Sequence, residues 1–145
     1  MYMEEKTRRL LQECGSGCIM GINSMEQVRE YVSEEKLGSV IDEYLEKNRN
    51  ILGEIEKLLA EGGSQDKEPG AVASAFSWFT TEMKLMMKDD SSQIAKIMMD
   101  GSNMGIQSLC KYIHDYEGAS EKSVSLAKKL VKIEEDFMKE LQQFM

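Results

Sequence analysis

The chain has 145 residues, a formal net charge of −8 at pH 7, 41% hydrophobic residues and 30% charged residues. One proline and 12 methionines predict an all-α protein, because proline interrupts helices whereas Met, Leu, Glu and Lys extend them. The acidic balance and the lack of a clustered basic face exclude nucleic acid and anionic membranes as expected partners.

The chain begins with the charged stretch MYMEEKTRRLLQ, which has no apolar run of the kind a secretory leader needs. No later stretch reaches the ~20 consecutive apolar residues of a membrane span. The three cysteines are an odd number in a chain long enough to form its own core, which is typical of reduced thiols. We therefore expect a cytoplasmic protein without membrane association, folded as a single helical-bundle domain over 1–145.

Two long helices are expected in the first half, at about 3–33 and about 36–61. Along the first, apolar positions recur at alternating steps of three and four, which is the pattern of a helix with one face in a bundle core. These positions are Leu11, Cys14, Cys18, Gly21, Met25, Val28 and Val32. The second helix is expected to end near EGGS, where a glycine can adopt the left-handed conformation that closes a helix.

A shorter helix at about 70–88 is expected between the two halves, after the polar stretch SQDKEPG. At ~1.5 Å per residue, residues 71–87 span roughly 25 Å, nearly the length of a bundle. Such a crossover places the next long helix parallel to the helix at 36–61 and antiparallel to the helix at 3–33. Trp78 and Leu85 in this segment are the candidate residues of a dimer interface.

The second half, with helices expected at about 91–116 and about 120–144, reads as a diverged copy of the first. The sequence MGINSM at 20–25 returns as MGIQSL at 104–109, an offset of 84 residues that carries Gly21 to Gly105. The second and fourth helices share their apolar spacing at an offset of 86, which carries Asn48 to Glu134. Two repeated helical hairpins would explain this match. Bundle patterning that two unrelated hairpins share is the alternative.

Glycine recurs within the first and third helices, as Gly17 and Gly21 and as Gly101 and Gly105. Each costs a helix roughly 1 kcal/mol relative to alanine, so another interaction must offset them. We expect the first and third helices to cross closely at these four glycines. Two alternatives remain: CGSGC forms a loop that splits the first helix, or the glycines make room for a bulky side chain such as Trp78 or for a second copy of the chain.

The duplicated hairpins, the long crossover and the polar residues on core faces resemble the ferritin-like superfamily, in particular its small uncharacterised bacterial members. The resemblance covers nearly the whole chain, although MGINSM and MGIQSL are not a known catalytic signature. It implies a ferritin-like four-helix bundle, in which a di-iron centre takes a Glu from each of two helices and a Glu-x-x-His from each of the others. The positions of this chain that would match those ligands carry Cys18, Ser102, Asn48 and Glu134. Of these four residues only Glu134 is a di-iron ligand. We therefore expect no di-iron centre, no ferroxidase activity and no cofactor.

The polar residues Cys18, Asn48, Ser102 and Glu134 are equivalent in pairs under the repeat, and they are expected to form one buried polar layer. A carboxylate in such a layer needs hydrogen-bonding partners or a raised pKa. The alternative is that Glu134 turns to solvent along an edge of the bundle. Methionines are frequent between Met83 and Met104, where they either fill the core or line an adaptable groove.

The cysteines and the single histidine offer a second possible metal set, because Cys14 and Cys18 share one helical face, as do Cys110 and His114. If the first and third helices cross at their glycines, Cys18 and His114 lie roughly 15 Å apart along the bundle. Cysteines that simply pack in the core are therefore favoured over a metal site.

These observations predict a protein that is not an enzyme, with an interaction or structural role. It is expected to associate with itself or with an unknown protein partner. The alternative is a metal-binding or redox protein with a non-standard ligand set in the bundle core, drawn from Glu134, Asn48, Cys18, Cys14 and Cys110.

Overall fold

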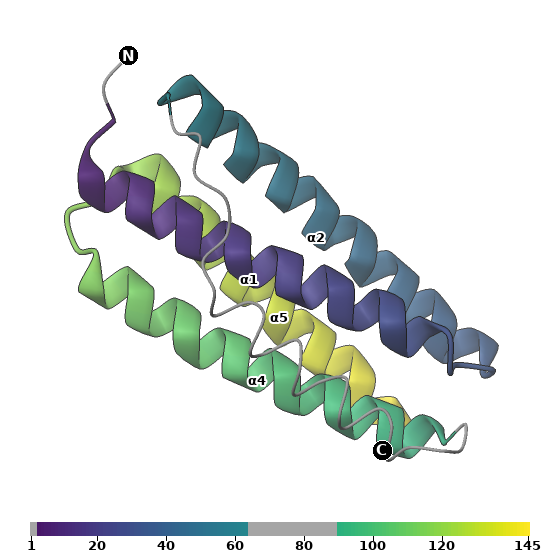
Figure 1. Cartoon of the computed structure of the whole chain (residues 1–145). Coiled ribbons are helices and arrows are strands. Elements are labelled where there is room, and N and C mark those ends of the chain that lie inside the picture. The colour runs from purple at the N-terminus through teal and green to yellow at the C-terminus, as the bar shows by residue number, and fades with distance from the viewer. Residues whose placement is uncertain (1–2, 64–89) are drawn as a thin grey trace.

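The computed structural model describes residues 3–63 and 90–145, which form an all-α four-helix bundle (Figure 1). The long helices are α1 (Glu5–Arg29), α2 (Glu35–Glu61), α4 (Ser91–Asp115) and α5 (Glu121–Leu141), and a 3-10 turn, η1 (Gln142–Phe144), follows α5. The predicted fold class of a four-helix bundle is thereby confirmed. The predicted crossover helix at about 70–88, with Trp78 and Leu85, lies outside the described residues. None of the described helices combines the length and the apolar character that a membrane span requires.

The helix ends follow local sequence signals. The Asp90 carboxylate accepts hydrogen bonds from the backbone N–H groups of Ser92 and Gln93 at the start of α4, and the Ser120 hydroxyl accepts one from Ser123 at the start of α5. These caps satisfy backbone donors that the first helical turn leaves unpaired. After α2 the chain leaves the helix through Gly63, whose φ of 82° is the left-handed conformation expected of the EGGS stretch.

The first helix is shorter than predicted, because α1 ends at Arg29 instead of continuing to 33. Beyond it the backbone N–H of Tyr31 bonds to the carbonyl of Val28, and that of Val32 to the carbonyl of Arg29, so the α-helical pattern gives way to a tight turn. Val32 still packs against the core from this turn. Val32, the apolar residue that led to the longer prediction, therefore contacts the core from outside the helix.

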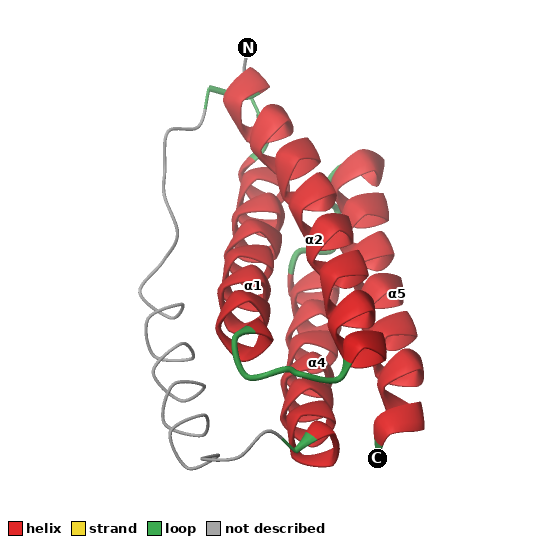
Figure 2. Cartoon of the chain, turned by 90° about the vertical axis from the view of Figure 1, so that its right-hand side faces the viewer, coloured by secondary structure: helices red, strands yellow, loops and turns green. Residues whose placement is uncertain are grey.

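The two hairpins, α1 with α2 and α4 with α5, are each antiparallel and pack side by side (Figures 1 and 2). Across the bundle, α1 contacts α4 and α2 contacts α5. Figure 1 shows that α4 runs parallel to α2 and antiparallel to α1. This is the helix order of a bundle with one long crossover.

Two apolar clusters fill the core, one toward each end of the bundle. One includes Met25, Ile41, Met98 and Phe137, and the other includes Leu10, Ile55, Leu109 and Leu130. Each cluster takes residues from all four long helices. Between them, the buried side chains of Asn48 and Ser102 interrupt the apolar core at mid-height.

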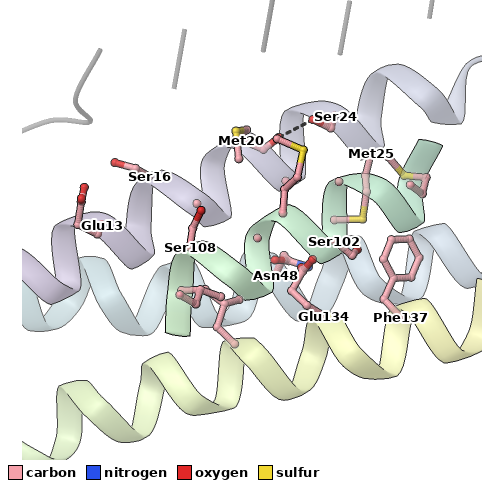
Figure 3. Close-up of a pocket in the computed structure, with 18 of the residues that line it drawn as sticks. Glu13, Ser16, Met20, Ser24, Met25, Asn48, Ser102, Ser108, Glu134 and Phe137 are labelled. Carbon is pink, nitrogen blue, oxygen red and sulfur yellow. Dashed lines mark hydrogen bonds between the residues drawn. The ribbon is translucent and has the colours of Figure 1, made fainter. Parts of the chain in front are cut away.

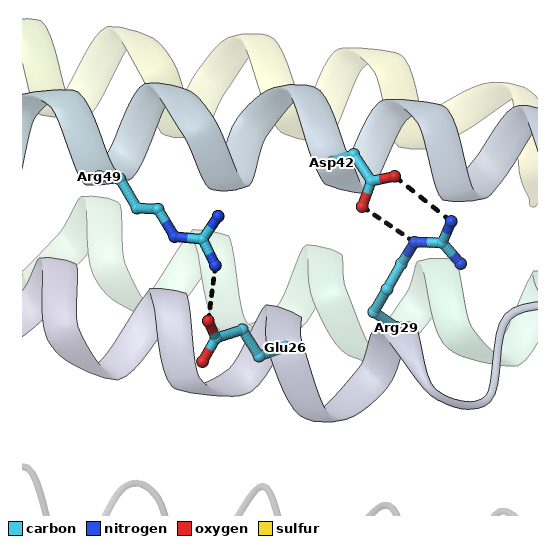
Figure 4. A network of polar contacts seen from close by, with 4 residues as sticks. All are labelled: Glu26, Arg29, Asp42 and Arg49. Atoms are coloured by element: carbon cyan, nitrogen blue, oxygen red, sulfur yellow. Dashed lines mark hydrogen bonds and ion pairs between the residues drawn. The ribbon is translucent and has the colours of Figure 1, made fainter.

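Exposed ion pairs join the two helices of the first hairpin (Figure 4). The Arg29 guanidinium of α1 donates to both carboxylate oxygens of Asp42 in α2, at 2.9 and 3.3 Å, and the Arg49 guanidinium of α2 donates to Glu26 of α1 at 2.6 Å. Such exposed pairs contribute at most about 1 kcal/mol each. The apolar clusters therefore provide most of the stability, while these pairs help to fix the register of α1 against α2.

Candidate functional site

A pocket of about 230 Å³ opens between α1 and α4, and side chains of α2 and α5 form its floor (Figure 3). Its described lining comes from all four long helices. The lining residues are Glu13, Ser16, Gly17, Met20, Gly21, Ser24, Met25, Asn48, Met98, Gly101, Ser102, Met104, Gly105, Ser108, Leu109, Tyr112, Leu130, Glu134 and Phe137.

The repeated motif lines this pocket from both sides. From α1 come the first, second, fifth and sixth residues of MGINSM, and from α4 come the same positions of MGIQSL. Residues at these spacings share one face of a helix, so each copy presents its methionine, glycine and serine to the same space. The pocket therefore has approximate twofold symmetry in its walls. The repeat is visible in the sequence, but it did not predict a cavity.

The glycines Gly17, Gly21, Gly101 and Gly105 all line the pocket, and the surroundings of three of them are described. A Cβ atom built on Gly17 would meet no described atom within 4 Å, and one on Gly21 would meet only Asn48 Oδ1, at 3.9 Å. A Cβ on Gly105 would lie 3.6 Å from Glu134 Oε2. At Gly21 and Gly105 the nearest groups are therefore side chains of α2 and α5, and at Gly17 the missing Cβ leaves open space. The predicted close contact of the first and third helices at Gly17, Gly21, Gly101 and Gly105 stays a prediction.

The neighbours of Gly21 and Gly105 show that the two hairpins are built in the same way. Gly21 of α1 faces Asn48 of α2, and Gly105 of α4 faces Glu134 of α5. The offsets of 84 and 86 residues that align the two halves of the sequence relate Gly21 to Gly105 and Asn48 to Glu134. Both hairpins thus use a glycine on their first helix to make room for a polar side chain on their second. The stretch CGSGC, for which a loop was the alternative, lies within the continuous helix α1.

The structure brings Asn48, Ser102 and Glu134 together on the pocket floor (Figure 3). Asn48 and Ser102 are 2% and 4% exposed, and Glu134 is partly buried. The Ser102 hydroxyl donates a hydrogen bond to the Glu134 carboxylate, and Asn48 Nδ2 donates to the carbonyl of Tyr44 at 2.8 Å. Cys18, the fourth residue of the expected polar layer, is fully buried and close enough to Glu134 to respond to its charge.

Burial raises the pKa of Glu134 to about 7, against a smaller lowering by the Ser102 hydrogen bond. Among the described lining residues there is no Lys, Arg or His to stabilise the ionised form. Near neutral pH this carboxyl therefore exists in both protonation states.

The buried thiols are poor candidates for metal binding or nucleophilic chemistry. Burial, with a smaller contribution from Glu13, raises the pKa of Cys14 to about 12, and burial raises that of Cys18 as well, helped by Cys14 and Glu134. A thiol must lose its proton to act as a ligand or nucleophile. Cys110 and His114 are exposed on α4, whereas Cys14 and Cys18 are buried. Over residues 3–63 and 90–145, no group of three or more His, Cys, Asp or Glu side chains is placed to hold a metal ion.

Several lining residues were not singled out from the sequence. Ser16 is 8% exposed, and its Oγ has no hydrogen-bond partner among the described residues. The Ser24 hydroxyl donates to the carbonyl of Met20 within α1, at 2.8 Å. The repeated serine of MGINSM and MGIQSL, present as Ser24 and Ser108, was the available signal, because a small polar residue that recurs on a core face indicates space beside it.

Comparison of the chain with protein-family models, with curated proteins and with solved structures finds no match. The fold and the pocket geometry therefore carry the functional argument.

Proposed function

We propose that this chain is a non-catalytic, ferritin-like helical bundle that binds a small, largely apolar molecule in the pocket between α1 and α4. The pocket itself carries the proposal. Protein interiors are normally packed without voids much larger than a water molecule. A space of about 230 Å³ between the two apolar clusters exceeds the ~150 Å³ of an engineered apolar cavity that binds benzene.

The walls suit a binding role. Met20 and Met25 on α1 and Met98 and Met104 on α4 supply flexible thioethers, which adapt to ligands of different shape. Met104 is 49% exposed, so one wall extends to the surface. The polar groups gather on the floor, as in small-molecule sites where a few polar groups orient an otherwise apolar ligand.

The ferritin-like part of the proposal rests on the helix order and on the position of the polar residues. Two antiparallel hairpins with α4 parallel to α2 have the order of a one-crossover bundle. The pocket floor lies at mid-height, where that architecture places its metal ligands. In this chain Asn48 and Ser102 stand there beside Glu134, which favours binding of an organic molecule over ferroxidase chemistry.

A pocket-filling variant with a matched control tests this function. Gly17→Leu places a side chain in the pocket, whereas Gly53→Leu adds the same side chain at an exposed site of α2 where a Cβ meets nothing within 4 Å. The probes are toluene and benzylamine, followed by ligand-observed NMR and by the shift in Tm. We expect at least one probe to bind the wild-type chain and Gly53→Leu, and neither to bind Gly17→Leu. Failure of both probes to bind the wild-type chain contradicts the proposal.

We also propose that the protein works in the cytoplasm and associates with itself or with a protein partner. Cys14 and Cys18 are buried free thiols, consistent with a reducing compartment. The interface residues expected from the sequence, Trp78 and Leu85, lie outside the described residues. Light scattering of the wild-type chain and of Trp78→Ala tests self-association, and a monomer at all concentrations contradicts it.

The metal-binding or redox alternative keeps Glu134 as its strongest ligand. This alternative is less favoured because the Glu134 carboxylate already accepts a hydrogen bond from Ser102, and because burial raises the pKa of the Cys14 and Cys18 thiols. Elemental analysis of the chain purified without added metal decides between the two: iron, manganese or zinc at one ion per chain would favour the alternative.

A further inference from the structure

We propose that the ligand of this pocket is a small apolar amine, held by an ion pair between its ammonium group and the Glu134 carboxylate. This inference rests on the proposed binding function and names its ligand class.

The pocket floor offers acceptors, and two of its donors already have partners. The Ser102 hydroxyl donates to the Glu134 carboxylate, and one N–H of Asn48 Nδ2 donates to the carbonyl of Tyr44. Asn48 Oδ1 remains as an acceptor 3.9 Å from the Cβ position of Gly21, and Glu134 Oε2 lies 3.6 Å from that of Gly105. An ionised carboxylate has about four lone-pair sites. A ligand that donates several hydrogen bonds from one end complements this floor.

The charges of the lining point to a cation. The described lining contains two acidic residues, Glu13 and Glu134, and no basic residue. The groups that face Glu134 from the neighbouring helices are neutral: the Cys18 thiol of α1, the Asn48 amide of α2 and the Ser102 hydroxyl of α4. A buried carboxylate without a partner is costly, whereas one paired with a hydrogen-bonding cation is stabilised. A bound ammonium group would supply the counter-charge that these side chains lack.

The rest of the pocket limits the size and character of the amine. The floor is flanked by Met25, Met98 and Phe137, so the body of the ligand meets apolar groups, and the ring of Phe137 can also favour a nearby cation. A volume of about 230 Å³ suits one ring with a short chain. Ser16, buried and without a described hydrogen-bond partner, lines the same pocket and offers a place for a second polar group on the ligand.

Benzylamine and toluene form a matched pair of probes, because they share a ring and differ in the amino group. Binding is measured by calorimetry and ligand-observed NMR on the full chain, on Glu134→Gln and on Glu135→Gln. The last variant removes the same charge from the exposed neighbouring position of α5. At pH 8 we expect benzylamine to bind the wild-type chain at least tenfold more tightly than toluene. Glu134→Gln should remove that preference and keep toluene binding, and Glu135→Gln should change neither.

The pH dependence provides a second readout. The amine keeps its proton between pH 6 and 8, whereas a carboxyl with a pKa of about 7 gains one as the pH falls through this range. Benzylamine affinity should therefore decrease about tenfold from pH 8 to pH 6 in the wild-type chain and stay constant in Glu134→Gln. Toluene affinity should be insensitive to pH.

The outcomes separate this inference from the function on which it rests. If toluene binds as tightly as benzylamine, or if Glu134→Gln keeps the amine preference while circular dichroism shows a folded protein, the amine proposal is overturned and the apolar pocket stands. If benzamide binds more tightly than benzylamine and its affinity rises at low pH, the protonated carboxyl acts as a donor to a carbonyl ligand, which also overturns it. If neither benzylamine nor toluene binds, both proposals are overturned.

Discussion

The Glu134 carboxyl has a pKa that burial brings close to neutral pH. Its neighbours on the pocket floor are Ser102 and Asn48, and the Ser102 hydroxyl gives it one hydrogen bond. That bond does not compensate for the loss of water, so the pKa rises from 4.5 to about 7. The folded state therefore binds a proton that the unfolded state has already released over this range of pH.

The first prediction follows from this difference. A carboxyl whose pKa is raised by folding stabilises the protein below about pH 4.5, and this contribution is lost as the pH rises toward and past 7. Relative to Glu134→Gln, the wild-type chain should lose roughly 2–3 kcal/mol of unfolding free energy between pH 4.5 and pH 8. Urea unfolding at several pH values measures it, with Glu135→Gln as the control. Parallel pH profiles for the wild type and Glu134→Gln would contradict the assignment.

Gly17 gives a second prediction at the same scale. Alanine there should stabilise the protein by about 0.5–1 kcal/mol, because helix propensity improves and the new methyl group meets no described atom within 4 Å. Gly53→Ala on the exposed side of α2 is the matched control and should give a similar gain. Thermal and urea unfolding measure both. A loss of stability at Gly17 with a gain at Gly53 would show that Gly17 sits in a tight contact.

The glycines also show how far the sequence could determine the site. Their spacing placed Gly17, Gly21, Gly101 and Gly105 on core faces, and the repeat made them equivalent in pairs. A pattern along one helix defines which face is buried, but it does not identify the atoms opposite that face. The side chains of Asn48 and Glu134 lie opposite Gly21 and Gly105, and their reach across each hairpin depends on tertiary packing.

At the scale of elements, the contact between α1 and α2 depends on a glycine of a different kind. A Cβ on Gly38 would lie 2.8 Å from Arg29 Nη2, so the guanidinium that pairs with Asp42 passes directly over this residue. The missing side chain allows the ion pair to lie flat against α2. Here the sequence offered no signal, because a surface pair between two helices has no periodic pattern.

Replacing Gly38 therefore has two opposing effects, which form the third prediction. Gly38→Ala should gain helix propensity and displace the Arg29 side chain from Asp42, an exposed pair that contributes about 0.2–1 kcal/mol. We expect a net change within about 0.5 kcal/mol at low salt, less than the gain at Gly53. In 1 M NaCl, where the pair is screened, the gain should approach that of Gly53→Ala. Equal gains at both sites in low salt would contradict this coupling.

The helices themselves were largely predictable, because steps of three and four mark them over many residues. Their ends were less so. The predicted first helix ran to 33 since Val32 continues the apolar pattern, yet α1 ends at Arg29 and Val32 reaches the core from a turn. Similarly, the helix predicted to 144 ends at Leu141, and η1 carries Phe144 into the core. An apolar pattern reports burial, and burial continues past the last helical hydrogen bond.

At the scale of the whole molecule, the two hairpins share one core. Each apolar cluster combines residues from α1, α2, α4 and α5, so neither hairpin has a separate apolar core in the described residues. The polar floor and the pocket lie between the clusters, and the pocket remains open only while both clusters hold the four helices at their spacing. Ligand binding and global stability should therefore be coupled.

The fourth prediction is that the four described helices unfold together, because they share one core. Native-state hydrogen exchange should give the central amides of α1, α2, α4 and α5 opening free energies within about 1 kcal/mol of one another. Leu126→Ala tests this directly, because Leu126 is 6% exposed and packs in the cluster that also contains Leu10 of α1 and Ile55 of α2. Truncating it should cost about 2–5 kcal/mol and lower the protection of both hairpins alike. Loss of protection in α4 and α5 alone would show two independently stable hairpins, and a pocket between them would then lack the rigid walls that selective binding requires.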